Sequence, residues 1–283
     1  MRRRLALPRA GVLLLTVLAL AVSACMLMPG RFVSELDVRR DGRFTFTYSG
    51  EIHLLALSKL AEREGGGGGT FTAGPCHDGD SAGRRERPCT PGELADQKAR
   101  WDADRLSRAE RRKRDAESMK PFLGGIDPAS PAAAEELAQR LRRQAGWRRV
   151  TYKGDGLFDV DFTISGRLDH DFAFPTIERF PLANSFVQIA LRQDGSVRID
   201  APGFGPAAGG EPLRALMQGA MSGQDKDSPA GFPVIDGTFT IRTDAEVLAN
   251  NTDDGPRPDP TGRRLDWLVT LRSQAAPMAL LRL

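Results

Sequence analysis

The residues best suited to chemistry are three cysteines, three histidines and a few acidic side chains. Cys76 and Cys89 bound a polar segment that also contains His77 and Asp78. Two thiolates, an imidazole and a carboxylate could ligate a metal ion, but the paired Cys-x-x-Cys spacing of structural zinc sites is absent. An even pair of cysteines in an exported chain favours a disulfide. We therefore predict a Cys76–Cys89 disulfide and no metal site, with metal binding as the alternative.

The histidines and acidic residues follow no familiar catalytic motif. His53 lies in an apolar stretch, and His170 lies between two aspartates that point away from it in an extended chain. Asp159 and Asp161 share the solvent face of a predicted strand, where carboxylates are ordinary. The nucleophile elbow, the dinucleotide fingerprint and the zincin motif are all missing. We predict no catalytic residue and no cofactor, and the alternative is a hydrolase whose site is assembled from scattered acidic residues.

The third cysteine, Cys25, ends a segment with the pattern of an export signal. Three arginines at residues 2–4 precede an apolar run over residues 11–22, and two small residues stand directly before the cysteine. This arrangement resembles the lipobox of bacterial lipoproteins, with Val22 where leucine is most usual. The resemblance implies a signal peptide over residues 1–24 and acylation of Cys25, palmitate included. The alternatives are a plain cleaved signal and an uncleaved helix, although the apolar run is shorter than the roughly 20 residues that span a bilayer.

Lipidation at Cys25 predicts a location in the bacterial cell envelope. Met26 rather than aspartate follows the cysteine, a pattern that in Gram-negative lipoproteins implies transport to the outer membrane, facing the periplasm. The formal charge of +3 falls to −1 once the four arginines of residues 1–24 are removed, so composition does not support nucleic-acid binding. We expect the membrane as a partner through Cys25, lipid, glycolipid or an envelope protein as a further partner, and no nucleic acid.

The mature chain begins with a predicted hairpin and helix over residues 25–62. Apolar residues alternate over residues 32–38 and 44–49 around Asp41-Gly42, a strong hairpin signal. The period then changes, and residues 52–60 are predicted to form a helix. Residues 63–90 are expected to be a flexible insertion with the disulfide, because five successive glycines lose too much backbone entropy on ordering.

Residues 91–146 are predicted to be helical. Thr90-Pro91-Gly92-Glu93 forms a capping box, which predicts a helix from residue 91 to about residue 119. Residues 97–114 carry a net charge of +5, which is typical of a solvated surface helix. The alternative is a face that contacts anionic lipid headgroups or a partner protein. A second helix is expected between a Ser130 cap and Gly146.

Residues 147–283 are predicted to form the β-rich remainder of the main domain. Alternating apolar residues favour an antiparallel meander, interrupted by a Gly, Pro and Ala-rich loop with a short helix near residues 213–221. The expected fold is α+β, a curved antiparallel β-sheet packed against two or three helices, with a disordered Gly-rich insertion. The inward phenylalanines would fill a core, and a ligand pocket is the alternative.

Three stretches together resemble the LppM-like family of bacterial envelope proteins. They are the strand, Asp-Gly turn, strand and helix of residues 32–60, residues 238–251, and Gly262-Arg263-Arg264-Leu265-Asp266-Trp267. The resemblance implies a helix-and-sheet domain with an apolar groove able to hold a lipid or glycolipid, and no catalytic residues. We therefore expect a membrane-anchored envelope lipoprotein of non-catalytic binding or structural type. A subunit of an envelope protein assembly, docking through the helix near Trp101, is a further alternative.

Overall fold

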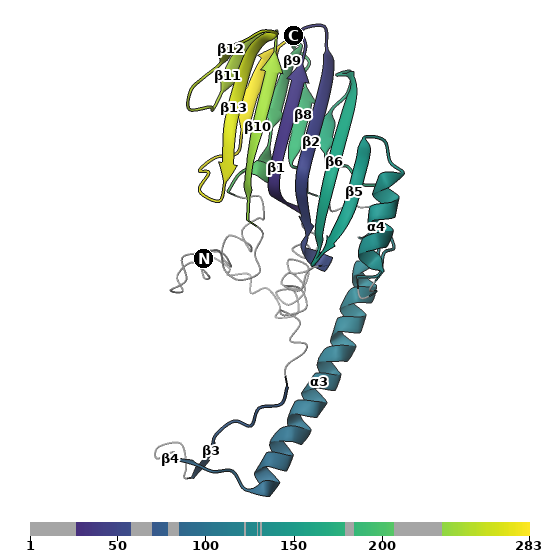
Figure 1. Ribbon diagram of the computed structural model, residues 1–283, viewed down its shortest axis with the longest axis vertical. Helices are drawn as coiled ribbons and strands as arrows, with labels where there is room; N and C mark the ends of the chain where they lie inside the picture. The colour runs from purple at the N-terminus through teal and green to yellow at the C-terminus, as the bar shows by residue number, and fades with distance from the viewer. Residues whose placement is uncertain are drawn as a thin grey trace, which may run out of the picture.

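The computed structural model describes residues 27–57, 70–78, 85–121, 123–128, 130, 132–178, 184–206 and 234–283. Most of the strands in this part of the chain form two sheets that lie one behind the other (Figure 1). The predicted signal peptide, Cys25, the glycine run and the helix expected near residues 213–221 lie outside the described residues.

The larger sheet has seven strands in the order β12-β13-β10-β1-β2-β6-β5. Their bounds are β1 (Leu27–Val38), β2 (Arg43–Leu54), β5 (Trp147–Gly154), β6 (Leu157–Arg167), β10 (Asp236–Thr243), β12 (Arg257–Asp259) and β13 (Gly262–Thr270). The central β1–β2 hairpin turns at Gly42, whose φ of 82° suits glycine, and confirms the hairpin predicted from the sequence.

A second sheet of five strands has the order β11-β14-β9-β8-β7. Its strands are β7 (Phe172–Phe174), β8 (Val187–Leu191), β9 (Ser196–Asp200), β11 (Glu246–Asn250) and β14 (Met278–Arg282). Two short strands, β3 (Cys76–Asp78) and β4 (Arg85–Arg87), pair separately, and single 3₁₀ turns cover Leu55–Leu57 (η1) and Pro202–Phe204 (η2).

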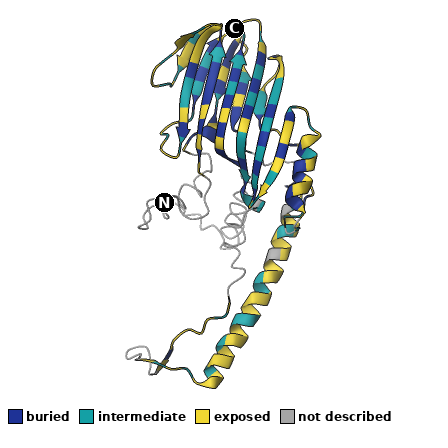
Figure 2. Ribbon diagram, viewed as in Figure 1, coloured by how far each residue is buried: buried dark blue, intermediate teal, exposed yellow. Residues whose placement is uncertain are grey.

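The core of the protein lies between the two sheets. Burial alternates along β1 and β2, so that one face of the larger sheet is apolar and covered (Figure 2). Phe46 and Tyr48 of β2 contact Phe174 of β7, with ring centroids 5.0 and 5.1 Å apart. Phe32 of β1 stacks on Phe204 of η2 at 4.4 Å. Aromatic side chains thus join the two layers, as expected for sheets packed face to face.

The coarse prediction of a mixed fold of strands and helices is confirmed, and the arrangement of the strands differs from the prediction in two features. The strands form two packed sheets, so a second sheet covers much of the inner face of the first. The pair β1–β10 is parallel, with Arg31 opposite Asp236, whereas an antiparallel meander was predicted. This pairing joins strands 205 positions apart (236 minus 31), and local alternation carries no information about such a partner.

The helix predicted over residues 52–60 is wrong for its first residues, which are extended. Ile52 and Leu54 are buried at the end of β2, and Ile52 pairs with Phe158 of β6. The β1–β2 register shifts beside Gly50, whose φ of 143° is open to glycine. This irregularity in the strand, rather than a helix, breaks the apolar period in the sequence.

Two α-helices, α3 (Pro91–Met119) and α4 (Ala133–Arg142), occupy the middle of the described chain. The capping box is present as predicted, because Thr90 Oγ1 accepts from the Glu93 amide at 3.3 Å and the Thr90 amide donates to Glu93 Oε2 at 2.8 Å. The predicted Ser130 cap lies two residues before the observed cap position of α4, where the Ser130 Oγ accepts from the Ala132 amide at 3.3 Å. Ala132 takes the cap position, and Ser130 instead forms a turn before the helix, with its carbonyl accepting from the Ala133 amide at 3.0 Å.

The two helices relate differently to the sheets. Leu137 and Leu141 of α4 are buried against the end of the larger sheet, beside Ile52 and Phe158. In contrast, α3 runs past the sheets as an arm and is mostly exposed along its length (Figures 1 and 2). The helix with the predicted capping box therefore lies outside the core.

Candidate functional site

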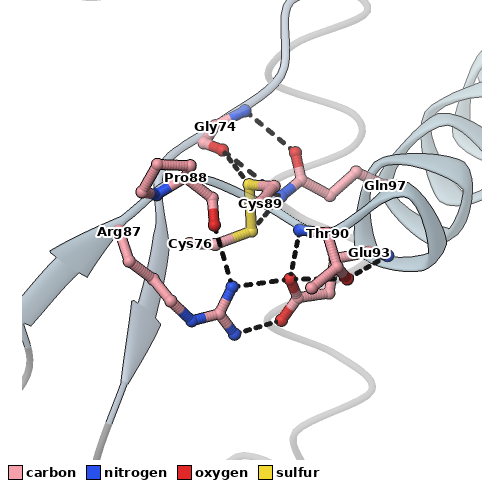
Figure 3. Close-up of a disulfide and its surroundings, with 8 residues drawn as sticks. All are labelled: Gly74, Cys76, Arg87, Pro88, Cys89, Thr90, Glu93 and Gln97. Atoms are coloured by element: carbon pink, nitrogen blue, oxygen red, sulfur yellow. Dashed lines mark hydrogen bonds and ion pairs between the residues drawn. A yellow bond between two sulfur atoms is a disulfide. The ribbon is translucent and has the colours of Figure 1, made fainter.

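The N-terminal tip of α3 is tied to a small hairpin by a disulfide (Figure 3). Cys76 of β3 and Cys89, which precedes the helix, are joined with their Cα atoms 5.1 Å apart, the pairing that the sequence predicts. Gln97 of α3 accepts from the Gly74 amide at 2.9 Å and donates to the Gly74 carbonyl at 3.3 Å. The segment before β3 is therefore held against the first turns of the helix.

An arginine of the hairpin holds the capping carboxylate. Arg87 donates to both oxygens of Glu93, from Nη2 at 2.6 Å and from Nη1 at 2.8 Å. These bonds, with those from Thr90, lower the pKa of Glu93 from 4.5 to about 2. Glu93 is thus ionised at neutral pH, and a negative charge in the first turn suits the helix dipole. The sequence predicted the capping box but not Arg87 as its partner.

Three arginines of α3 share one side of the helix, because at about 100° per residue their spacings of eight and three residues place them within an arc of about 80°. We call Arg100, Arg108 and Arg111 the basic stripe. Within the described residues none of them forms an ion pair. Arg100 Nε donates to a helix carbonyl at 3.3 Å, and Arg111 Nη2 lies 3.4 Å from the hydroxyl of Ser107. Other cations of α3 do meet carboxylates, as Lys98 does with a separation of 3.0 Å.

Trp101 lies beside the basic stripe. Its ring meets the ring of Phe71 edge-on, with centroids 6.1 Å apart. The guanidinium carbon of Arg105 lies 5.3 Å from the centroid of the same ring, a cation–π distance. Segment 70–75 and α3 therefore share a small aromatic contact on an arm that is otherwise exposed.

The structure does not bring the histidines together. His53 lies in β2, and burial lowers its pKa, so the ring is neutral at pH 7. His170 is exposed, and its ring nitrogen contacts the neighbouring Asp169. His77 pairs with Glu86 in the β3–β4 hairpin. Among the described residues, no three His, Cys, Asp or Glu side chains lie close enough to hold a metal ion.

Asp159 and Asp161 face solvent on β6, and Arg149 of β5 binds both. Arg149 Nη1 lies 2.6 Å from Asp159 and its Nε lies 2.7 Å from Asp161. The hydrogen bond from Arg149, followed by that from Ser49, lowers the pKa of Asp161. The sequence reasoning missed Arg149, although alternation on two neighbouring strands could have placed it opposite Asp161. An ionised, paired carboxylate of this kind is suited to holding strands together.

The hollows lined by described residues differ in size and in lining. The apolar cavity between α4 and the larger sheet measures about 10 Å³, roughly one water molecule, and Leu27, Leu137 and Trp147 contribute to its walls. Two open hollows of about 670 and 660 Å³ lie at the end of the sheets near the β1–β2 turn. The arginines of the first are already bonded: Arg39 pairs with Asp37, and Arg43 lies 2.6 Å from Asp41.

Comparison with known proteins gives one structural likeness. No protein-family model matches the chain, and no curated protein matches it. A solved structure does. It is the NMR structure of the folded domain of the Mycobacterium tuberculosis LppM protein. The two share 13% sequence identity over 90% of each chain, with a TM-score of 0.28. The LppM-like resemblance seen at the two ends of the sequence is therefore found again among solved structures, at low similarity. None of the helices in the described residues is both long and apolar enough to span a membrane.

Proposed function

We propose that the protein is a membrane-anchored envelope lipoprotein of binding or structural type, held at the bilayer by acylated Cys25. It would lie in the outer membrane and face the periplasm. More than one acyl chain on the cysteine makes such anchoring stable rather than transient. The role is non-catalytic, and contact with lipid, glycolipid or an envelope protein would be made by the folded part.

The observation that supports this proposal most directly is the start of the folded chain. Leu27, two residues after Cys25, is already buried at 2% exposure as the first residue of β1. Its amide donates to Asn184 Oδ1 at 2.8 Å, and Asn184 Nδ2 donates back to its carbonyl at 2.9 Å. A lipid on Cys25 would thus be connected to the core almost without a linker, and would fix one end of the body at the membrane surface.

Lipid contact at the surface fits the geometry better than lipid held between the sheets. Phe174, Phe186 and Phe204, all at 0–1% exposure, occupy that space. The cavity of about 10 Å³ beside it cannot hold an acyl chain. Lipid recognition would therefore take place on the outside of the protein and not in an apolar groove between the sheets.

The test is the intact mass of the native protein and of a Cys25→Ser variant, each isolated from membranes. The native protein should begin at Cys25 and carry the added mass of diacylglycerol and an N-acyl chain. The variant should lack both and keep its leader or leave the membrane fraction. A native protein with an unmodified thiol, or with residues 1–24 still attached, contradicts the proposal.

A further inference from the structure

The arm formed by α3 projects from the end of the body where the chain begins. Figure 1 shows α3 extending away from the end of the larger sheet at which β1 starts, with its disulfide-bonded tip far from both sheets. The 29 residues of α3 span about 43 Å at roughly 1.5 Å per residue. The β1–β2 turn lies at the opposite end of the body, since Val38 and Leu27 are the two ends of β1.

The proposed anchor at Cys25 restricts the orientations that the protein can take at a membrane surface. Cys25 and Met26 alone separate the lipid from Leu27, so this link reaches about 7 Å. If the strands stood perpendicular to the membrane with the start of β1 at its surface, α3 would extend into the hydrocarbon. The helix carries eight basic and seven acidic side chains, and each one at the bilayer centre costs about 2.5–3.5 kcal/mol on insertion scales. The molecule must therefore tilt until α3 runs beside the bilayer.

We infer that α3 lies along the membrane surface and that its basic stripe binds anionic phospholipid headgroups. The inference rests on the proposed function, because the anchor at Cys25 sets the distance. Residues 97–114 carry a net charge of +5, which complements an anionic leaflet. Within the described residues the guanidinium groups of Arg100, Arg108 and Arg111 form no ion pair. Arg100 and Arg111 are exposed and can bind phosphate oxygens, for which arginine geometry is well suited. Arg108 is half-buried, and its Nε has no hydrogen-bond partner among the described residues.

Two further features of the arm suit this role. Trp101, next to the stripe, is the residue type most typical of the membrane–water interface. The disulfide, the Gln97 bonds and the Arg87–Glu93 pair hold the outer end of the helix in place. Such fixing reduces the entropy lost when the arm settles on the surface. The β3–β4 pair and α3 together form a preordered unit, and its contact with the membrane would restrict rotation of the two sheets about the lipid at Cys25.

The experiment uses the full-length lipoprotein, purified from membranes and reconstituted in vesicles. One set of vesicles is phosphatidylcholine alone, and the other contains phosphatidylglycerol, with brominated acyl chains in each to quench nearby tryptophan. A Trp101→Phe variant identifies the part of the signal that belongs to Trp101. The charge variant is Arg100→Gln, Arg108→Gln and Arg111→Gln together. The matched control, Arg40→Gln with Arg167→Gln and Arg263→Gln, removes three arginines at the opposite end of the sheets.

Trp101 emission should be quenched in the phosphatidylglycerol vesicles and much less in phosphatidylcholine alone. The charge variant should lose that quenching, while the control variant keeps it. Added salt should also weaken the quenching, because at about 0.1 M salt the Debye length is roughly 10 Å and charge attraction beyond it is screened. Equal quenching in both lipids, or equal loss in both variants, overturns the inference. Intact mass of the same sample separates the two failures: acylated Cys25 without quenching refutes only the arm, and absent acylation refutes the anchor.

Discussion

The substitution Phe174→Ala tests whether the space between the sheets is a packed core or a ligand pocket. The Phe174 side chain is 0% exposed, and its ring lies 4.7 to 6.0 Å from the rings of five other residues. These are Phe46, Tyr48, Trp147, Phe162 and Phe186. Removing a buried phenyl group loses its transfer free energy and leaves a cavity, which together cost about 3–5 kcal/mol. That is a large share of the roughly 5–15 kcal/mol that stabilises a domain.

Urea unfolding followed by far-UV circular dichroism and by tryptophan fluorescence measures this loss. Phe172→Ala is the matched control, since Phe172 lies two residues earlier on β7 and is half-buried. Among the described aromatic rings it contacts those of Phe44 and Phe46. The Phe172→Ala substitution should lower the free energy of unfolding by less, about 1–2 kcal/mol. If Phe174→Ala costs no more than the control, or if added lipid restores its midpoint to the native value, the space is a pocket and the packing argument fails.

The remaining predictions concern the tip of α3 and the anchor. Replacing Cys76 and Cys89 together by serine should remove about 3 kcal/mol of loop-closure stabilisation from the tip, so amide exchange should accelerate in residues 85–97 while the urea midpoint of the sheets is unchanged; a shifted midpoint contradicts this. Glu93 has a pKa of about 2, below its ordinary 4.5, so its stabilisation is complete above that ordinary value and is lost as pH falls toward 2. A carboxyl NMR titration should give this low pKa for Glu93, and an inflection of the Glu93 signal near pH 4.5 would refute the prediction. The Glu93→Gln variant should lose the acid dependence of stability at the start of α3. The Cys25→Ser mass measurement and the Trp101 quenching complete the set.

Local signals in the sequence were reliable where a few neighbouring residues decide the structure. The β1–β2 hairpin follows from alternation around Gly42, and the start of α3 from the reciprocal bonds of Thr90 and Glu93. The failure at residues 52–54 has a local cause as well. A register shift beside Gly50 disturbs the period in a way that is indistinguishable, along the chain alone, from the start of a helix.

The sequence by itself determined the hairpin, the two helices, the pairing of Cys76 with Cys89 and the expectation of a lipidated Cys25. Only the tertiary structure decided that two sheets enclose the aromatic core, that β1 runs parallel to β10, and that Asn184 fastens Leu27 beside the predicted anchor. It also decided that α3 projects as an arm. The physical reason is range: capping and turn bonds are made between neighbours in the chain, whereas sheet partners and helix placement depend on which distant apolar faces exclude water together.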